Sequence, residues 1–276
     1  MSEPTSGAEL RRAPFPEVNT EVAHVARVYD FLLGGETNFA VDRAAAEEVT
    51  ASAGGVETSR RYVRANRRFL GRAVRYLVTE AGVRQFLDLG SGIPTEENVH
   101  EVAQAIAPES RIVYVDNDPI VLAHGHQLLK SSEEGATVFL HSDLRDHDDV
   151  LREAAATLDF SRPVAVMLVS MLHLFPDSAR PYELLQPYLD AVPSGSYLVL
   201  SHLAGESDEM SKLGEAVEDN DTMNYTLTMR GRADVTRFFD GLDLVEPGVV
   251  FVDEWRPDPD DPTGTIPFHC GVARKP

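Results

Sequence analysis

The sequence predicts an α/β fold: a Rossmann-like, mostly parallel sheet of seven strands with helices on both faces. From residue 84 onward, short apolar segments alternate with amphipathic ones, which is typical of the β–α units that build a parallel sheet. The first apolar segment runs into Gly90-Ser91-Gly92, and the second ends at Asp116. A glycine turn and an acidic residue after neighbouring strands mark the carboxyl edge of such a sheet, where ligands bind.

The expected elements follow one another along the chain from residue 84. The strands are expected at 84–89, 111–116, 137–141, 163–169, 195–201, 244–252 and 267–273, and the helices near 95–107, 119–130, 147–157, 177–191 and 232–240. No helix separates the last two strands, so we expect an antiparallel C-terminal hairpin at the sheet edge. The polar segment 202–231 has little periodicity and is interpreted as a lid or a partner surface.

The region before the sheet is expected to form a flexible arm and then a helical cap. Residues 1–20 contain three prolines and few large apolar side chains, which is typical of a loose arm. Apolar residues then recur at helical spacing and predict helices over 22–33, 40–49 and 57–79. These helices would form an N-terminal cap over 21–80, in front of a main domain at 81–276.

The composition argues against several functional classes. The 276 residues carry a formal net charge of −20, which opposes binding to the phosphates of nucleic acid. The single cysteine, Cys270, cannot form an internal disulfide and indicates a reducing compartment. No signal peptide opens the chain, and no apolar run reaches the roughly 18 residues of a membrane span. We therefore expect a cytoplasmic protein with no membrane partner. The histidines lack metal-ligand spacing, so we also expect no metal site.

The glycine turn favours one nucleoside cofactor over another. A dinucleotide fingerprint needs a third small residue that lets a helix close on a pyrophosphate, but Gly92 is followed by Ile93, Pro94 and Thr95. Asp88, two residues before Gly90, would repel a diphosphate and attract a cation. S-adenosylmethionine (SAM) carries an ammonium and a sulfonium and has no phosphate, so SAM is favoured over NAD.

Two strand ends supply candidates for the nucleoside. Asp116 can accept hydrogen bonds from both ribose hydroxyls. After the third strand, Asp143 can accept from the adenine amino group while Leu144 packs on the ring. The alternative is that Asp143 merely caps the following helix.

The fourth strand end and the long N-terminal helix supply further candidates. Ser170 and His173 follow the strand where the methyl group and its acceptor would meet, so Ser170 is expected to line the cofactor site. His173 is either a general base or a structural histidine. No G-x-S-x-G elbow surrounds Ser170, which argues against a serine hydrolase. Arg67 or Arg64 could hold a carboxylate, although most arginines of this helix are expected to pair with acidic neighbours on a solvated face.

Beyond these motifs, the chain resembles one bacterial family of class I S-adenosyl methyltransferases, long catalogued only as a domain of unknown function. The resemblance covers about residues 19–275, and its segments are 26–35, 38–43, 66–70, 92–95, 98–100, 114–119 and 271–274. It implies that SAM binds to the turn 88–92, to Asp116 with Asn117, and to Asp143 with Leu144. It also implies that the N-terminal helices fold over the cofactor and bring Tyr29 or Asp30 near it. The family comes with no substrate.

The function predicted from the sequence is therefore SAM-dependent methyl transfer to an unidentified, small-molecule acceptor held under the 202–231 lid. A sensor or interaction protein that binds SAM without turnover is the alternative, and an NAD-dependent oxidoreductase is less favoured. The negative net charge argues against nucleic acid as the acceptor. The sequence predicts no oligomeric state.

Overall fold

The strands form one sheet that carries the site at its carboxyl edge. The computed structural model describes residues 18–276 apart from 96, 122, 124–129, 224, 260, 262–263 and 265. Within these residues, eight strands lie in the order β3-β2-β1-β4-β5-β8-β6, and β7 also pairs with β8. They are β1 (Gln85–Leu89), β2 (Arg111–Asp116), β3 (Ala136–His141), β4 (Ala165–Val169), β5 (Tyr197–Leu203), β6 (Asp243–Leu244), β7 (Val250–Phe251) and β8 (Phe268–Arg274). Strands β1 to β5 are parallel and β8 is antiparallel to β5, which confirms the predicted Rossmann-like fold class.

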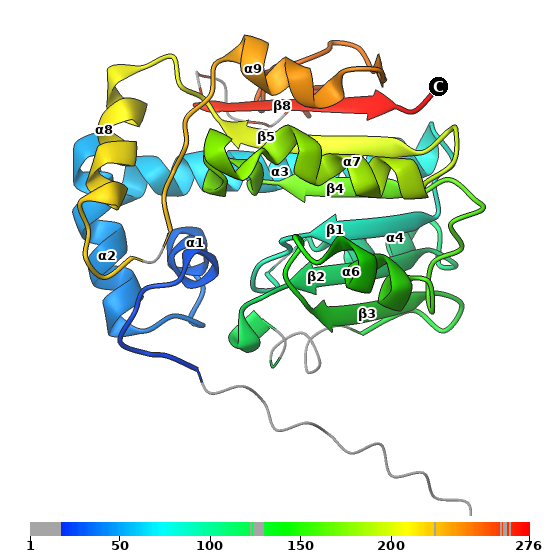
Figure 1. The fold of residues 1–276 in the computed structure, drawn as a ribbon, viewed down its shortest axis with the longest axis horizontal. Coiled ribbons are helices and arrows are strands. Elements are labelled where there is room, and N and C mark those ends of the chain that lie inside the picture. Colours follow the sequence, from blue (N-terminus) through cyan, green and yellow to red (C-terminus); the bar gives the residue numbers. More distant parts are fainter. Residues whose placement is uncertain are drawn as a thin grey trace, which may run out of the picture.

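Helices cover both faces of the sheet, and further helices lie beyond its carboxyl edge (Figure 1). The α-helices are α1 (Val25–Leu33), α2 (Ala40–Thr50), α3 (Gly55–Thr79), α4 (Val99–Ile106), α6 (His147–Ala154), α7 (Pro181–Ala191), α8 (Asp208–Glu218) and α9 (Arg232–Thr236). Short 3₁₀ turns lie at 51–53, 172–174, 177–179 and 237–239. In Figure 1, α3 and α4 lie behind the sheet, α6 and α7 lie in front, and α1, α2 and α8 stand at the left. None of the described helices combines the length and the apolar character that crossing a membrane requires.

Each parallel strand is apolar on both sides because helices cover both faces. Phe86 of β1 belongs to a core cluster with Phe69 of α3 and Val99 of α4. The next residue, Leu87, belongs to a second cluster with Val150 of α6 and residues of α7. Successive side chains of a strand point to opposite faces, so a strand covered on both faces needs apolar residues at every position. This explains the continuous apolar runs in the sequence.

The prediction of one strand over 244–252 is wrong, because the structure has two short strands there. β6 ends at Leu244 and β7 begins at Val250, and both pair antiparallel with β8. Between them, Pro247 has no amide hydrogen to donate to a ladder, and Gly248 has a φ of 87° that only glycine adopts readily. The chain therefore turns away from β8 and returns to it.

The segment 202–231 contains a helix that its sequence pattern did not predict. β5 continues to Leu203, and α8 follows with Ser207 as its N-cap, whose side chain accepts from the Met210 amide. Met210 and Val217 of this helix are buried and Leu213 is partly buried, so a short apolar stripe at helical spacing is present, although polar residues outnumber it in the segment around it. The predicted helix 119–130 is helical at 119–121 and at 123, and the rest of its central part lies outside the described residues, as does most of the predicted arm.

One arginine of α3 is buried rather than solvated. Arg72 donates to the carbonyl oxygens of Trp255 (3.0 Å) and Val252 (2.5 Å) and forms an ion pair with Asp261. The Trp255 ring packs edge-on against Phe69 at 5.5 Å between ring centroids. Arg72 thus fastens the linker between β7 and β8 to the back of the sheet.

We expect Arg72→Met to lower the free energy of unfolding by about 3 kcal/mol, because it leaves two buried carbonyls without their donor and removes the cation nearest to the Asp261 carboxylate. Arg75→Met is the matched control: Arg75 pairs with Asp258 at the surface, where the loss is about 0–1 kcal/mol. Urea unfolding of both variants measures the difference. Equal losses of unfolding free energy in the two variants would show that the buried contacts of Arg72 stabilise the fold no more than the surface ion pair of Arg75 does.

Candidate functional site

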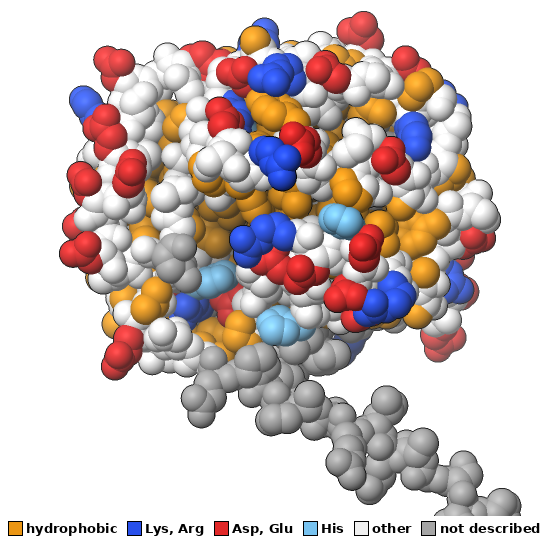
Figure 2. All heavy atoms as spheres, in the orientation of Figure 1, with side chains coloured by type: hydrophobic (Ala, Val, Ile, Leu, Met, Phe, Trp, Pro, Cys, Tyr) orange, Lys and Arg blue, Asp and Glu red, His pale blue; other side chains and the backbone are white. Residues whose placement is uncertain are grey.

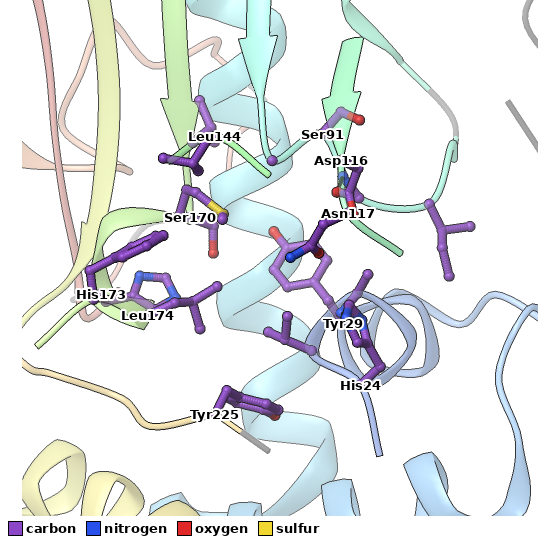
Figure 3. A pocket seen from close by; sticks show the side chains of 18 of the residues that line it. His24, Tyr29, Ser91, Asp116, Asn117, Leu144, Ser170, His173, Leu174 and Tyr225 are labelled. Carbon is purple, nitrogen blue, oxygen red and sulfur yellow. Dashed lines mark hydrogen bonds between the residues drawn. The ribbon is translucent and has the colours of Figure 1, made fainter. Parts of the chain in front are cut away.

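A cavity of about 720 Å³ opens at the carboxyl ends of the parallel strands, within the range of about 300–1,000 Å³ that is typical of small-molecule sites. Figure 2 shows apolar side chains in a hollow on this side of the molecule, and Figure 3 shows the cavity between the strand ends and α1. Every residue predicted for the site lines this cavity: Tyr29, Asp30, Arg67, Asp88, Gly90, Ser91, Gly92, Asp116, Asn117, Asp143, Leu144, Ser170 and His173. Sequence positions up to 144 residues apart, from 29 to 173, therefore meet at one place.

The glycine turn after β1 brings backbone to the edge of the cavity. Gly90 and Gly92 have φ values of 77° and 67°, and the Gly90 amide donates to the Val115 carbonyl at 2.8 Å. A Cβ on Gly90 would lie 2.3 Å from the sulfur of Met171, whereas a Cβ on Gly92 would meet no atom within 4 Å. The positive φ favours glycine at both positions, a Cβ on Gly90 would also displace the Met171 side chain, and Gly92 leaves open space beside the backbone.

Asp116 connects the turn after β1 to the turn after β2. Its carboxylate accepts the Gly92 amide at 2.8 Å and the Asp118 amide at 2.9 Å, and its side chain is almost fully buried. Burial raises the pKa of this carboxyl, and the two backbone hydrogen bonds act in the opposite direction. Each carboxylate oxygen can accept a second hydrogen bond, so the group can still receive a hydroxyl from the cavity.

Asp88 is a second buried carboxyl at the floor of the same cavity. Burial raises its pKa to about 7, Arg67 lowers the pKa through its positive charge, and Asp116 raises it through its negative charge. The Arg67 guanidinium donates to the Glu97 carbonyl at 3.2 Å and lines the cavity. A carboxyl with a pKa near neutrality gains its charge when a cation arrives beside it.

Asp143 lies at the end of β3, on the far side of the strand edge from Asp88. It accepts from the Arg145 amide and Nε (2.9 Å each) and from a terminal guanidinium nitrogen (2.5 Å), and the bond to this side chain lowers the pKa of Asp143. Its side chain closes a local turn at Arg145 and does not cap α6, whose N-cap is Asp146. Leu144 is buried, and the Asn117 side chain also hydrogen-bonds Asp143.

Tyr29 and Asp30 reach the cavity from α1 in different ways. Tyr29 extends into the middle of the cavity, between Ser170 and Asn117 (Figure 3). The Asp30 carboxylate accepts from the Thr37 amide (2.9 Å) and the Asn38 side chain (2.8 Å), which closes the turn between α1 and α2. The contacts of Asp30 give it a structural task in this turn, and its predicted contact with a cofactor stays a prediction.

His173 lies in the 3₁₀ turn after β4 and is buried. Burial lowers its pKa well below 6.5, and nearby His202 and Arg230 lower it further. Its Nδ1 accepts a long hydrogen bond from the Leu203 amide (3.5 Å), which leaves Nε2 as the protonated nitrogen. The imidazole is therefore neutral at physiological pH. These contacts do not test the predicted role as a general base.

Several cavity residues were not among the predicted ones. They include His24, Met171, Leu174, Met223 and Tyr225, together with Asn66 beneath Tyr29. Asn66 had a signal in the sequence: it lies four residues after Tyr62 and three before Phe69, on an otherwise apolar helix face. No such signal marked Val217, Glu218, Met223, Tyr225 and Thr226, because they come near α1 only through the fold.

Comparisons with known proteins agree with this geometry. A family model described as S-adenosyl methyltransferase matches residues 11–276. A domain-of-unknown-function family 574 protein from Streptomyces avermitilis is 40% identical, with a TM-score of 0.88 over 93% of this chain and 99% of that one. A protein from Thermobifida fusca, named as a candidate methyltransferase, is 40% identical, with a TM-score of 0.82 over 93% of this chain and 96% of that one. No protein among curated sequences matches the chain.

The raised pKa of Asp88 predicts how stability changes with pH. An Asp pKa of about 3.9 in the unfolded chain and about 7 in the folded one means that the folded state binds the proton more tightly. The contribution of Asp88 to stability is therefore greatest below pH 4 and is lost as pH rises to 7. We expect Asp88→Asn to be more stable than the native chain at pH 8 by at least about 1 kcal/mol.

The measurement is urea unfolding of both proteins at several pH values. The native-minus-variant difference is expected to change between pH 4 and 7 and to be flat above about pH 8. A difference that does not depend on pH would contradict a raised pKa for Asp88.

Proposed function

The chain belongs to the S-adenosyl methyltransferase family and is a SAM-dependent methyltransferase, and we propose that its acceptor is a small, neutral or cationic molecule with an apolar body. The observation that carries this proposal is the cavity at the strand ends, in which carboxylates from three strand ends lie beside apolar side chains that include Leu33, Leu174, Val217 and Met223. At about 720 Å³, that cavity has room for a nucleoside cofactor and a small second molecule.

The residues of the cavity fit SAM by their chemistry. We assign the ribose hydroxyls to Asp116 and the adenine to Asp143, Asn117 and Leu144. The open space beside Gly92, where a Cβ would meet nothing, can accept the part of the cofactor next to the turn. We assign the ammonium to Asp88 and the carboxylate to Arg67, because these opposite charges lie together at the floor.

When bound, SAM supplies an electrophilic methyl group that an acceptor atom takes by in-line displacement. The chain's residues align the reactants and exclude water, which lowers the barrier without a covalent step on the protein. The neutral His173 is proposed to receive a proton from the acceptor at Nδ1, the nitrogen that carries the lone pair, which releases its long hydrogen bond from the Leu203 amide (3.5 Å) to do so. A hydroxyl becomes strongly acidic once it carries the methyl group, so even a base of low pKa can take its proton.

The acceptor chamber is proposed to lie under the 202–231 lid, between α1 and the turn after β4. Its walls include Leu33, Leu174, Phe175, Val217 and Met223. The lid segment is hydrogen-bonded to the N-terminal region at two points. The Ala23 amide donates to the Thr222 carbonyl (2.9 Å), and the Asn220 side chain donates to Glu48 (2.9 Å). The same segment reaches the His173 carbonyl through the Thr228 amide (2.7 Å).

The preference for neutral or cationic acceptors follows from the charges around the cavity. Five carboxyl groups line it, those of Asp30, Asp88, Asp116, Asp143 and Glu218. Two guanidinium groups oppose them, and that of Arg145 is paired with Asp143. Together with a net charge of −20, this arrangement repels anions, including nucleic acid.

The proposal is tested by incubation with SAM that carries a labelled methyl group and with three panels of small aromatic acceptors: neutral, cationic and anionic. We expect label transfer, with equimolar S-adenosylhomocysteine, for neutral or cationic compounds, and little for anionic ones. Reactions without acceptor are the control. Transfer to DNA or RNA would contradict the proposed acceptor class. Tight SAM binding without turnover, in the panels and in cell extracts, would favour the alternative of a sensor.

Asp116→Ala is expected to weaken SAM binding by about 10- to 100-fold while the protein stays folded, because a charge-assisted hydrogen bond contributes about 1.5–3 kcal/mol. Isothermal titration measures the affinity. Asp148→Ala is the matched control, since it removes the same charge from an exposed position on α6, and its affinity is expected to equal the native one. An unchanged affinity in Asp116→Ala would remove this residue from the ribose role.

A further inference from the structure

A chain of hydrogen bonds runs beneath the cavity from the end of β4 to Tyr29. The Ser170 amide donates to the Ser201 hydroxyl oxygen (2.9 Å), the Ser201 hydroxyl donates to Asn66 Oδ1 (2.6 Å), and Asn66 Nδ2 donates to the Tyr29 hydroxyl (2.9 Å). Asn66 and Ser201 are 1% and 0% exposed. The chain therefore joins β4, β5, α3 and α1 through buried polar groups that all have partners.

The direction of every link is determined by the group at its start. A backbone amide can only donate, so Ser201 accepts from Ser170 and sends its own hydrogen to Asn66. The carboxamide oxygen of Asn66 is then the acceptor, which turns its NH₂ group toward Tyr29. The phenol oxygen thus receives a hydrogen bond, and its own hydrogen can reach the Val63 carbonyl at 3.3 Å. Tyr29 is held in one orientation.

The residue at which this series of hydrogen bonds begins, Ser170, has an uncommon backbone conformation. Ser170 has a φ of 62°, in the left-handed region that non-glycine residues seldom adopt. Its amide is held by the Ser201 carbonyl (3.1 Å) as well as by the Ser201 hydroxyl. Such conformations persist where the surroundings enforce them, and they concentrate at ligand sites. A row of hydrogen bonds that only satisfied buried polar groups would not need to begin at a strained residue in the cavity wall.

Tyr29 lies where the charged centre of the methyl donor has to pass. The ring stands in the middle of the cavity, with its hydroxyl toward Ser170 and Asn117 on its other side (Figure 3). The sulfonium joins the nucleoside, assigned to Asp116, to the amino acid, assigned to Asp88, so it lies between these residues. An aromatic face carries negative potential and attracts a cation within about 6 Å.

We propose that Tyr29 recognises the positive sulfonium and that Asn66 and Ser201 are positioning residues that hold the ring in place. This inference rests on the proposed cofactor placement and adds a role for two residues outside the predicted site. It means that the protein distinguishes SAM from its product, S-adenosylhomocysteine, which lacks the methyl group and the charge but keeps every other group.

The test is the ratio of the two dissociation constants, for S-adenosylhomocysteine and for SAM, measured by titration calorimetry without any acceptor. Tyr29→Leu is expected to lower this preference for SAM about tenfold. Tyr29→Phe keeps the aromatic ring and is expected to lower the preference for SAM less than Tyr29→Leu does. Asn66→Ala and Ser201→Ala are expected to lower the ratio part of the way, and Ser201→Thr, which retains the hydroxyl, to restore it.

Two controls separate positioning from general destabilisation. Tyr114→Phe removes another buried tyrosine hydroxyl, which accepts from the His100 amide and does not line the cavity, and it is expected to leave the ratio unchanged. In the Tyr29→Leu background, Asn66→Ala is expected to change the ratio no further, since it acts through Tyr29. If Asn66→Ala does not fold, Ser201→Ala and the two Tyr29 variants carry the test.

The outcomes distinguish this inference from the proposed function. An equal loss of affinity for both ligands, or an unchanged ratio in Tyr29→Leu, would overturn the sulfonium role while leaving SAM binding in place. A native protein that binds neither ligand would overturn the proposed cofactor placement itself.

Discussion

The hydrogen bond from the Gly92 amide to the Asp116 carboxylate joins the two turns on which the cavity depends. The Gly90 amide, in the same turn as Gly92, also reaches back to the Val115 carbonyl, so the ends of β1 and β2 are held together at two points. Without this connection, a carboxylate and a glycine turn would each lie on a separate loop. With it, both approach the same space from fixed directions, which is the condition for gripping a nucleoside at a sheet edge.

The site combines groups that a protein core would otherwise avoid. Asp88 and Asp116 are buried carboxyls whose pKa values are raised, and Ser170 has a left-handed backbone. Each of these features opposes folding and is tolerated because the apolar clusters on both faces of the sheet hold the strand ends in place. A cationic ligand reduces the cost of burying the Asp88 and Asp116 carboxyls, since it stabilises their ionised form. Stability and binding are therefore coupled through the same side chains.

The roof of the cavity comes from segments far apart in the sequence. α1 and the segment after α8 meet through the backbone bridge between Ala23 and Met223, and Thr228 continues that segment to the turn after β4. This side of the cavity is thus enclosed by elements that are not part of the Rossmann-like sheet. In the proposed function the two tasks divide accordingly: the strand ends hold the cofactor, and the N-terminal helices with the segment after α8 shape the space for the acceptor.

The fold class was determined by the sequence itself, because continuous apolar strands, amphipathic helices and a glycine turn are local patterns with local physical causes. The site residues at strand ends could be predicted for the same reason, since the carboxyl ends of parallel strands converge at one edge. The division of 244–252 into two strands was missed because the turn at Gly248 lies within one apolar segment. The helix α8 was missed although Met210, Leu213 and Val217 recur at helical spacing, because the segment around them is mostly polar. The link from Ser170 through Ser201 and Asn66 to Tyr29 was decided only by the tertiary structure. Its directly bonded members are separated by up to 135 residues, and only packing brings those polar groups within hydrogen-bonding distance.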